Sequence, residues 1–505
     1  MKRPGPLISP RKRNISILVV IVFVFMGTFS APKIEGLPST IDEYEAQSLD
    51  WSSCYNNFDC SYVQVPIDYQ NLALGRFKLG VLRHKATRQK DRIGSLVLNP
   101  GGPGASGVEY AYNAEYIFSA DLLQKYDIVG FDPRGVGESA PIRCLDDRQT
   151  DESYSADSKP DNAEELRILI EQVRAYAKKC YSRTKNVLHY STRDSARDMD
   201  ILRAALKEKK LNFLGVSYGT YLGTLYAELF PEHVGRMVLD GAVSPNVNSA
   251  DQNLTQAIGF DMALDAFILD CYLKEECTLA QPIEKGRAEI ISLFENSAKS
   301  PLTSTTGRAV TESLIVLGTA SALYDPSMGW PQLRVGLAEA EKGDGTTLLS
   351  LADDYAQRRS DGTYSNNEAD AAFVIDCLDW RGARSTESIK ELAKKFTEKA
   401  PVFGPYLAYS GLSCQFITAP VQSAMKTGEI VTSPIIIIGT TRDPATPYVW
   451  AQELHDAIQN SRLISLEADG HTGYGHGSTC VDSAVDRYFL TGILPTSDLT
   501  CKSPA

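Results

Sequence analysis

Short apolar segments alternate with longer stretches of helical pattern through much of this chain. Two early segments, residues 63–67 and 77–82, alternate apolar side chains with others and predict neighbouring strands that pair antiparallel. Short strands separated by helical stretches are typical of a mostly parallel, doubly wound sheet with helices on both faces. The pattern therefore predicts an α/β fold. Later runs rich in β-branched residues predict the remaining strands, at residues 96–98, 127–131, 213–216, 237–239, 435–438 and 463–466.

The alternation stops between the sixth and seventh of these predicted strands. Residues 244–433 carry mostly amphipathic helical pattern and four of the ten cysteines, and the strand at residues 435–438 follows them. We therefore predict a largely helical cap at residues 244–433, inserted into a core made of residues 51–243 and 434–505. The alternative is a separate C-terminal domain, but the returning strand argues against it.

The N-terminus has the pattern of a targeting segment. Five basic residues precede an apolar run over residues 15–29, and the small residues Thr28 and Ser30 offer a cleavage site before Ala31. This run is shorter than the about 20 residues that a transmembrane helix needs. We predict a signal peptide at residues 1–30, a polar leader at residues 31–50 and a secreted or otherwise extracytoplasmic protein. The alternative is an uncleaved N-terminal membrane anchor.

The ten cysteines are separated by short and long gaps in strict alternation. Taken as neighbours in order, the separations within pairs are 6, 36, 6, 37 and 21 residues, and the gaps between pairs run from 66 to 100 residues. An even count in an exported chain predicts disulfides, although sequence alone leaves their connectivity open. The alternation favours neighbour pairing, which gives Cys54–Cys60, Cys144–Cys180, Cys271–Cys277, Cys377–Cys414 and Cys480–Cys501. Because the chain has no C-x-x-C motif and no histidine cluster with metal-ligand spacing, we predict no metal and no cofactor.

Composition and charge narrow the classes of partner. The chain has 43% hydrophobic and 23% charged residues, which is ordinary for a globular protein. Its net charge of −12 argues against nucleic acid and anionic membrane surfaces as partners. An acidic protein suits a cationic ligand such as the free α-amino group of a peptide, although acidity also serves solubility.

One motif carries chemistry directly: G-V-S-Y-G at residues 215–219, between a predicted strand and a helical pattern. A G-x-S-x-G sequence in that position is typical of a nucleophile elbow, a tight turn that exposes a reactive serine, here Ser217. A Gly-rich loop, N-P-G-G-P-G at residues 99–104, follows an earlier predicted strand. The main-chain N–H groups of Gly102 in this loop and of Tyr218 after the serine are the predicted oxyanion hole.

Together with F-D-P-R-G-V-G-E-S at residues 131–139, these two motifs resemble the proline iminopeptidase and tripeptidyl aminopeptidase group of α/β-hydrolases. The motifs G-T-T-R-D-P-A-T-P at residues 439–447, G-H-T at residues 470–472 and G-I-L-P at residues 492–495 resemble the C-terminal module of the secreted tripeptidyl branch. The resemblance runs from about Trp51 to Cys501. Iminopeptidases usually begin the first loop with His, whereas Asn99 stands here, which favours the tripeptidyl branch. The resemblance implies an α/β-hydrolase fold and a serine exopeptidase.

This fold supplies its catalytic residues in the chain order Ser, then acid, then His. Asp443 follows the seventh predicted strand and is the first candidate for the acid, with Asp240 after the sixth strand as the alternative. His471 directly follows the last predicted strand, and His476 in the same loop is the alternative base. We predict that Ser217 is the nucleophile, that His471 is its base and that Asp443 orients the histidine.

An aminopeptidase must bind a protonated N-terminus, normally with carboxylates near the reacting serine. Asp376 and Asp379 flank Cys377 on one predicted helical turn of the cap, and a disulfide beside them would fix their position. They are candidate ligands of the substrate amine. The alternative is that they are ordinary surface acids on a helix.

The sequence therefore predicts an exported serine exopeptidase that releases short peptides, tripeptides first, from free N-termini through an acyl-enzyme. A carboxylesterase or lipase would use the same three residues. A catalytically silent binding protein would keep the fold alone, and the intact elbow, acid and base argue against that alternative. The expected partners are peptides with free N-termini, with no nucleic acid and no membrane beyond a possible N-terminal anchor.

Overall fold

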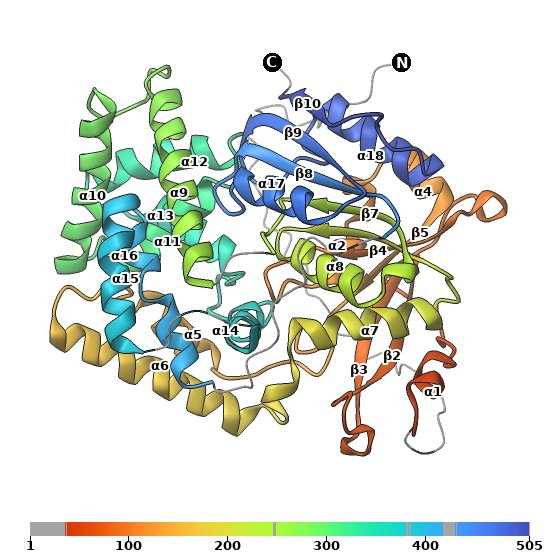
Figure 1. The fold of residues 1–505 in the computed structure, drawn as a ribbon. Helices are drawn as coiled ribbons and strands as arrows, with labels where there is room; N and C mark the ends of the chain where they lie inside the picture. Colours follow the sequence, from red (N-terminus) through yellow and green to blue (C-terminus); the bar gives the residue numbers. More distant parts are fainter. Residues whose placement is uncertain are drawn as a thin grey trace.

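The computed structural model describes residues 36, 38–245, 249–379, 382, 385–417, 430 and 432–503. The predicted signal peptide, residues 1–30, lies outside the described residues. Within them, the strands form one ten-stranded sheet in the order β1-β2-β3-β5-β4-β6-β7-β8-β9-β10 (Figure 1). The strands are β1 (Ser52–Cys54), β2 (Phe58–Pro66), β3 (Arg76–His84), β4 (Gly94–Asn99), β5 (Tyr126–Phe131), β6 (Leu211–Val216), β7 (Val234–Asp240), β8 (Ile435–Arg442), β9 (Ser461–Asp469) and β10 (Leu499–Lys502).

The sheet is antiparallel at one edge and parallel elsewhere. β1 pairs antiparallel with β2, β2 with β3 and β3 with β5, so the antiparallel pairing predicted for the first two segments is confirmed. All other neighbouring strands run parallel. β4 and β5 are buried at every position, because parallel strands covered on both faces need continuous apolar runs. The mostly parallel α/β fold is confirmed.

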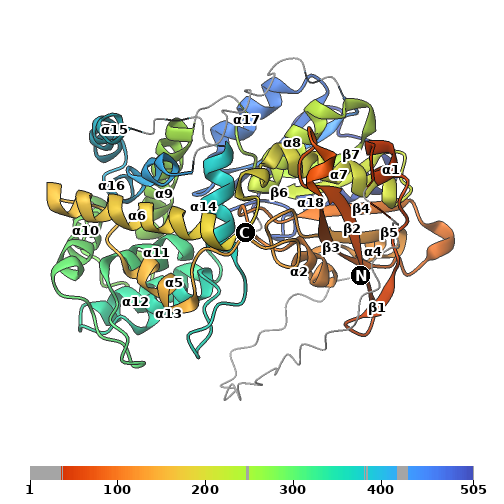
Figure 2. The same ribbon diagram turned by 90° about the horizontal axis from the view of Figure 1, so that it is seen from below.

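Helices cover both faces of the sheet (Figure 2). On one face lie α1 (Ile41–Glu45), α7 (Thr192–Ala205), α8 (Tyr218–Leu229) and α17 (Tyr448–Ala457). On the other lie α2 (Gly107–Tyr112), α3 (Ala114–Ile117), α4 (Ala120–Lys125) and α18 (Thr479–Thr491).

The short helix α1 belongs to the segment that the sequence pattern assigned to a polar leader. Its Tyr44 is fully buried in the apolar cluster on one face of the sheet, and the helix contacts α7 and β2. The folded part of the chain therefore begins before Trp51.

A layer of helices lies beside the sheet, on the left in Figure 1. Most of them fall between β7 and β8, which are the sixth and seventh predicted strands, and they enclose an apolar core of their own around Phe267, Phe294 and Leu333. We call this layer the cap. Its helices between β7 and β8 are α9 (Ser249–Cys271), α10 (Ile283–Lys299), α11 (Glu312–Ala322), α12 (Gly329–Ala340), α13 (Thr346–Tyr355), α14 (Glu368–Asp379), α15 (Thr386–Lys399) and α16 (Gly404–Leu407).

Two further helices of the cap layer come from another part of the chain. α5 (Asp147–Ser155) and α6 (Ala163–Arg183) lie between β5 and β6 in sequence, and they pack beside the cap helices (Figures 1 and 2). Arg358 of the cap pairs with Asp151 of α5 at 2.6 Å. The sequence pattern did not place these helices there, since amphipathicity shows that a helix has an apolar face but not which layer covers it.

Five disulfides occur in the described residues, and all five join the predicted neighbours. The pairing prediction is confirmed. Disulfides persist in oxidising compartments, so this set fits an extracytoplasmic location. Among the helices that the structure describes, none is both long and apolar enough to cross a membrane.

Candidate active site

Ser217 occupies a tight turn between the end of β6 and the start of α8. Its backbone angles are φ +56° and ψ −126°, a sparsely populated conformation for a residue with a side chain. Its N–H donates to the carbonyl oxygen of Asp240 at the end of β7 (2.8 Å). The flanking glycines permit the turn, because a Cβ on Gly215 would lie 2.4 Å from the carbonyl oxygen of Gly219. This is the geometry expected of a nucleophile elbow.

The Gly-rich loop after β4 lies against this turn. Gly101 and Gly102 have φ values of +103° and +100°, in the region that favours glycine. The side-chain oxygen of Asn99 accepts the N–H of Gly101 at 3.1 Å. A Cβ on Gly101 would lie 3.0 Å from the main-chain nitrogen of Tyr218. The structure thus brings the loop that contains Gly102 next to Ser217 and Tyr218, which is the arrangement that an oxyanion hole requires.

Asp443 follows β8 and His471 follows β9, and their side chains meet. Nδ1 of His471 lies 2.9 Å from both carboxylate oxygens of Asp443. The Asp443 carboxylate is fully buried. It also accepts the main-chain N–H groups of Ala445 at 2.9 Å, Thr446 at 2.8 Å and Thr472 at 3.2 Å. These bonds fix the direction in which the carboxylate faces the imidazole.

The end of β7 connects this pair with the serine turn. The main-chain carbonyl oxygen of Asp240 accepts the N–H of Ser217. A Cβ on the next residue, Gly241, would lie 3.1 Å from Cε1 of His471. Burial lowers the pKa of His471, but the Asp443 carboxylate beside it and the charge of Asp240 together raise this pKa by more, so it lies above its ordinary value. A histidine in this setting can take up a proton near neutral pH and hold it as an ion pair with Asp443.

The two alternative residues have different partners. The carboxylate of Asp240 is buried and accepts the main-chain N–H groups of Gly473 (2.9 Å) and Tyr474 (2.8 Å), which lie just after His471. Burial raises the pKa of Asp240 to about 6. Nε2 of His476 lies 3.0 Å from the hydroxyl oxygen of Thr472. The geometry therefore pairs Asp443 with His471, and Asp240 instead holds the loop that follows the histidine.

The cap also contacts the loop that holds His471, and no sequence motif predicted this contact. The main-chain N–H of His471 donates to the carbonyl oxygen of Tyr324 at 2.8 Å, and the two rings meet edge to face with their centroids 5.2 Å apart. A Cβ on Gly470 would lie 2.7 Å from Cδ of Pro326. The segment after α11 therefore packs directly on the histidine loop and limits its movement.

A cavity of about 460 Å³ lies between the core and the cap and contains the serine turn. The core lines it with Gly102, Ser217 and Tyr218, and the cap lines it with residues that include Asp376 and Asp379. A larger hollow of about 720 Å³ lies within the cap beside α10, but none of the predicted site residues lines it. We therefore place the candidate active site in the smaller cavity.

The two acids predicted to bind an amine lie at the end of α14. Asp376 is open to the cavity although protein surrounds it, and burial, followed by the charge of Asp379, raises its pKa to about 7. Asp379 also lines the cavity and accepts hydrogen bonds from the main-chain N–H of Thr192 (3.3 Å) and from the Thr192 hydroxyl. Thr192 is a second residue that sequence reasoning missed, since a threonine at a helix start carries no catalytic signal.

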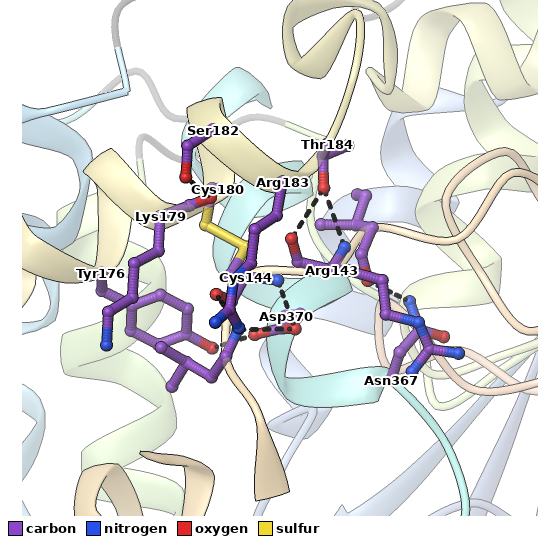
Figure 3. The surroundings of a disulfide bond; sticks show 12 residues. Arg143, Cys144, Tyr176, Lys179, Cys180, Ser182, Arg183, Thr184, Asn367 and Asp370 are labelled. Atoms are coloured by element: carbon purple, nitrogen blue, oxygen red, sulfur yellow. Dashed lines mark hydrogen bonds between the residues drawn. A yellow bond between two sulfur atoms is a disulfide. The ribbon is translucent and has the colours of Figure 1, made fainter.

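Helix α14 is held firmly at both ends. Figure 3 shows Asp370, on its first turns, beside the Cys144–Cys180 disulfide, where it accepts the N–H of Cys144 (2.7 Å) and the Tyr176 hydroxyl (2.8 Å). Asn367, just before the helix, donates through its amide to the main-chain oxygens of Gly135 (2.8 Å) and Ile142 (2.9 Å). The Cys377–Cys414 disulfide fixes the other end. The acids on this helix therefore face the cavity from a rigid support.

Similarity to known proteins spans both the core and the cap. Residues 94–282 match the family described as alpha/beta hydrolase fold, and residues 400–501 match the family described as TAP-like protein. The chain is 33% identical to serine protease Hip1 of Mycobacterium tuberculosis, over 96% of each chain. It is 34% identical to the tripeptidyl aminopeptidase of Streptomyces lividans, over 90% of this chain and 86% of that one. It is also 35% identical to carboxylesterase B of M. tuberculosis, over 90% of each chain.

In the part of the chain that the structure describes, no three His, Cys, Asp or Glu side chains lie close enough together to hold a metal ion.

The serine turn, the Gly-rich loop against it and the buried Asp443–His471 pair are the parts on which serine hydrolases of this fold depend. With relatives this similar over nearly their whole length, the chain belongs to the TAP-like family of α/β-hydrolases and is a serine hydrolase.

Proposed function

We propose that this serine hydrolase is an exopeptidase that removes short peptides, tripeptides above all, from free N-termini. The observation that supports this most is the shared cavity, which Ser217 lines from the core and Asp376 and Asp379 line from the cap. Carboxylates in the wall of this cavity suit the charged end of a peptide chain, which carries a protonated amine. The tripeptidyl aminopeptidase of S. lividans is one of the relatives that support this substrate class.

In the proposed mechanism, Ser217 Oγ attacks the carbonyl carbon of the scissile peptide bond while His471 Nε2 takes the hydroxyl proton. Asp443, hydrogen-bonded to Nδ1 of His471, keeps the imidazole in the required tautomer and stabilises its charged form. The N–H groups of Gly102 and Tyr218 bind the oxyanion. His471 then returns the proton to the departing amine as the C–N bond breaks. In the second half of the reaction, His471 takes a proton from the water that attacks the acyl-enzyme and returns it to Ser217 Oγ as the ester bond breaks.

The experiment that tests this proposal compares substrates. Aminoacyl-, dipeptidyl- and tripeptidyl-coumarins with free N-termini are assayed beside their N-acetylated forms and beside short p-nitrophenyl esters. We expect the free tripeptidyl substrate to have the highest kcat/KM and its acetylated form to be far slower. Equal rates for free and acetylated peptides would contradict an exopeptidase that recognises the amine.

A carboxylesterase is the second candidate, because carboxylesterase B of M. tuberculosis is 35% identical to this chain over 90% of its length. The same substrate panel separates the two functions. Higher kcat/KM for p-nitrophenyl esters than for every peptide would identify an esterase. We favour the peptidase, since an ester of this kind has no cation to match the two carboxylates of the cavity.

We also propose that the protein is exported by the predicted signal peptide at residues 1–30. The five disulfides support this location, because such bonds persist outside the reducing cytoplasm. N-terminal sequencing of the mature protein tests the proposal. A new N-terminus near Ala31 is expected, and an intact Met1 on a membrane-bound protein would favour the N-terminal anchor instead.

Asp376→Asn should impair free-N-terminal peptides selectively. Removal of one partner of a buried charge pair costs about 3–5 kcal/mol, which corresponds to a loss of roughly 10²–10⁴-fold in kcat/KM. The N-acetylated tripeptidyl substrate and p-nitrophenyl acetate have no amine to bind, so their kcat/KM should barely change. Glu387→Gln, which alters an exposed acid on the cap helix α15, is the matched control and should affect none of the substrates.

Equal losses on all three substrates would show that Asp376 supports the structure, and an unchanged rate on the free tripeptide would place the amine elsewhere. Asp379→Asn is assayed in the same way. Its carboxylate already binds Thr192. A loss in this variant that extends to the ester would therefore show that Asp379 supports the geometry of the site, and a loss confined to the free tripeptide would show that it binds the amine.

The pH dependence of KM should report Asp376. Its pKa is raised to about 7, so the free enzyme loses this negative charge as the pH falls through 7, and KM for the free tripeptide rises. The α-amino group of a peptide titrates at about 7.7–8.0 and loses its positive charge above that range. KM should therefore be lowest between roughly pH 7 and 8. Asp376→Asn should remove the acid limb, and a KM independent of pH from 6 to 8 in the wild type would contradict the assignment.

A further inference from the structure

A chain of hydrogen bonds joins the acid end of the cavity to the residue after Ser217. The Tyr218 hydroxyl contacts the Thr192 hydroxyl, and the Thr192 hydroxyl contacts the carboxylate of Asp379. Each member stands at the end of a helix: Tyr218 is the first residue of α8, Thr192 is the first residue of α7, and Asp379 is the last residue of α14. Residues far apart in the sequence thus form one short line beside the serine turn.

The donors of this chain have a defined direction. A carboxylate accepts hydrogen bonds only, so Thr192 must give its hydroxyl proton to Asp379, and Tyr218 must give its own to Thr192. The Tyr218 hydroxyl keeps its proton for this purpose, since burial and the nearby Asp379 charge hold its pKa well above the ordinary value. Bonds arranged head to tail in a buried site strengthen one another.

The start of α7 helps to hold the charge at the far end of the chain. The main-chain N–H of Thr192 donates to Asp379 at 3.3 Å, and this helix of 14 residues directs its N-terminus at the carboxylate. A helix N-terminus stabilises a negative charge. Asp379 therefore anchors the end of the chain, whereas Asp376, three residues earlier on the same helix, is open to the cavity.

The other end of the chain fixes a group that the proposed mechanism uses. The N–H of Tyr218 is one of the two proposed oxyanion donors, and it lies against the Gly101 main chain. Ser217 before it has a strained conformation, and the bond from its N–H to the carbonyl oxygen of Asp240 holds the turn. The anchored tyrosine ring adds a second restraint on the first residue of α8 and so on the direction of its N–H.

We propose that Thr192 and the Tyr218 side chain are positioning residues that couple the acid end of the cavity to the oxyanion hole. This inference rests on the proposed function. A substrate ammonium bound at Asp376 and Asp379 restrains the Asp379 side chain, which is the acceptor at the end of the chain, and so limits the movement of Thr192 and of the Tyr218 ring. Binding energy from a part of the substrate that does not react is thereby used to raise kcat.

The test uses Tyr218→Phe and Thr192→Val, which remove one hydroxyl each, with Thr192→Ser as the matched variant that keeps it. Each is assayed on a tripeptidyl-coumarin, on its N-acetylated form and on p-nitrophenyl acetate. Loss of a whole oxyanion donor lowers kcat by about 10²–10³-fold, so a misdirected one should lower kcat on all three substrates by about 10-fold or more. KM for the small ester should stay within about twofold, and Thr192→Ser should restore kcat.

The coupling has its own signature. In the wild type the free tripeptide should have a higher kcat than its acetylated form, and this ratio should fall towards one in Thr192→Val and Tyr218→Phe. Unchanged kcat on the ester in both variants would overturn the positioning role. A rise in KM for the free tripeptide alone would also overturn it, because the chain would then belong only to the binding surface.

Two controls keep these outcomes distinct from other failures. Thermal unfolding of each variant shows whether a lost rate reflects a lost fold, and the comparison of Thr192→Ser with Thr192→Val removes effects of shape. If the wild type does not distinguish free from acetylated tripeptide, the proposed exopeptidase function fails. The ester assay still decides the positioning of Tyr218 in that case, since it needs no amine.

Discussion

Ser217→Ala and His471→Ala should each lower kcat by at least about 10⁴-fold, because a nucleophile and its base act as a unit and neither works alone. A fluorophosphonate probe should label the wild type at Ser217 and should not label the serine variant. The double variant should be little worse than either single one. Active-site titration of the wild type with the probe, and kcat of each variant on the tripeptidyl-coumarin at matched concentrations of folded protein, measure both effects.

His476→Ala is the matched control for the base. Both histidines lie in the loop after β9, but His476 contacts the Thr472 hydroxyl, whereas His471 contacts the Asp443 carboxylate. We expect only a small loss in the His476 variant. If it were the more damaging of the two changes, His476 would be the base, and the pairing seen in the structure would describe a resting arrangement only.

The order of the serine, the acid and the base along the chain could be predicted from sequence, because each of these three residues follows a strand. In a mostly parallel sheet, the loops after neighbouring strands meet at one edge. Ser217 follows β6, Asp443 follows β8 and His471 follows β9, so the sheet itself brings them together. The cysteine pairing could also be predicted, since each pair joins two successive cysteines along the chain and the prediction needs no knowledge of how the cap packs.

The contacts between layers could not be predicted in this way. Tyr324 reaches the histidine loop from the cap, and Thr192 reaches Asp379 from the start of α7. Neither contact leaves a periodic pattern or a motif, because each depends on how two separately folded surfaces meet. The helices α5 and α6 show the same limit on a larger scale. The sequence pattern predicts their apolar faces but not the layer of the structure against which those faces pack.

The identity of the acid is the second large effect. Asp443→Asn should leave the fold intact and lower kcat by about 10⁴-fold. The asparagine amide would donate to Nδ1 of His471, which would place the imidazole proton on Nε2, facing Ser217. In that tautomer Nε2 has no lone pair free for the serine proton. The fold should persist, because the asparagine oxygen can still accept the N–H groups of Ala445 and Thr446, which bind the same carboxylate oxygen. Of the main-chain bonds, only the longer one from the Thr472 N–H to the other oxygen is lost.

Asp240→Asn is the matched comparison, since Asp240 is also buried and also ends a strand. Its carboxylate binds the N–H groups of Gly473 and Tyr474 and not the imidazole nitrogen. Loss of part of that pair should cost about 0.5–1.5 kcal/mol, and thus about 10-fold or less in kcat. Assays of both variants on p-nitrophenyl acetate, with melting curves, separate the two roles. A nearly active Asp443→Asn beside an inactive Asp240→Asn would transfer the acid's role to Asp240, and the bond between Asp443 and Nδ1 makes the opposite result the expected one.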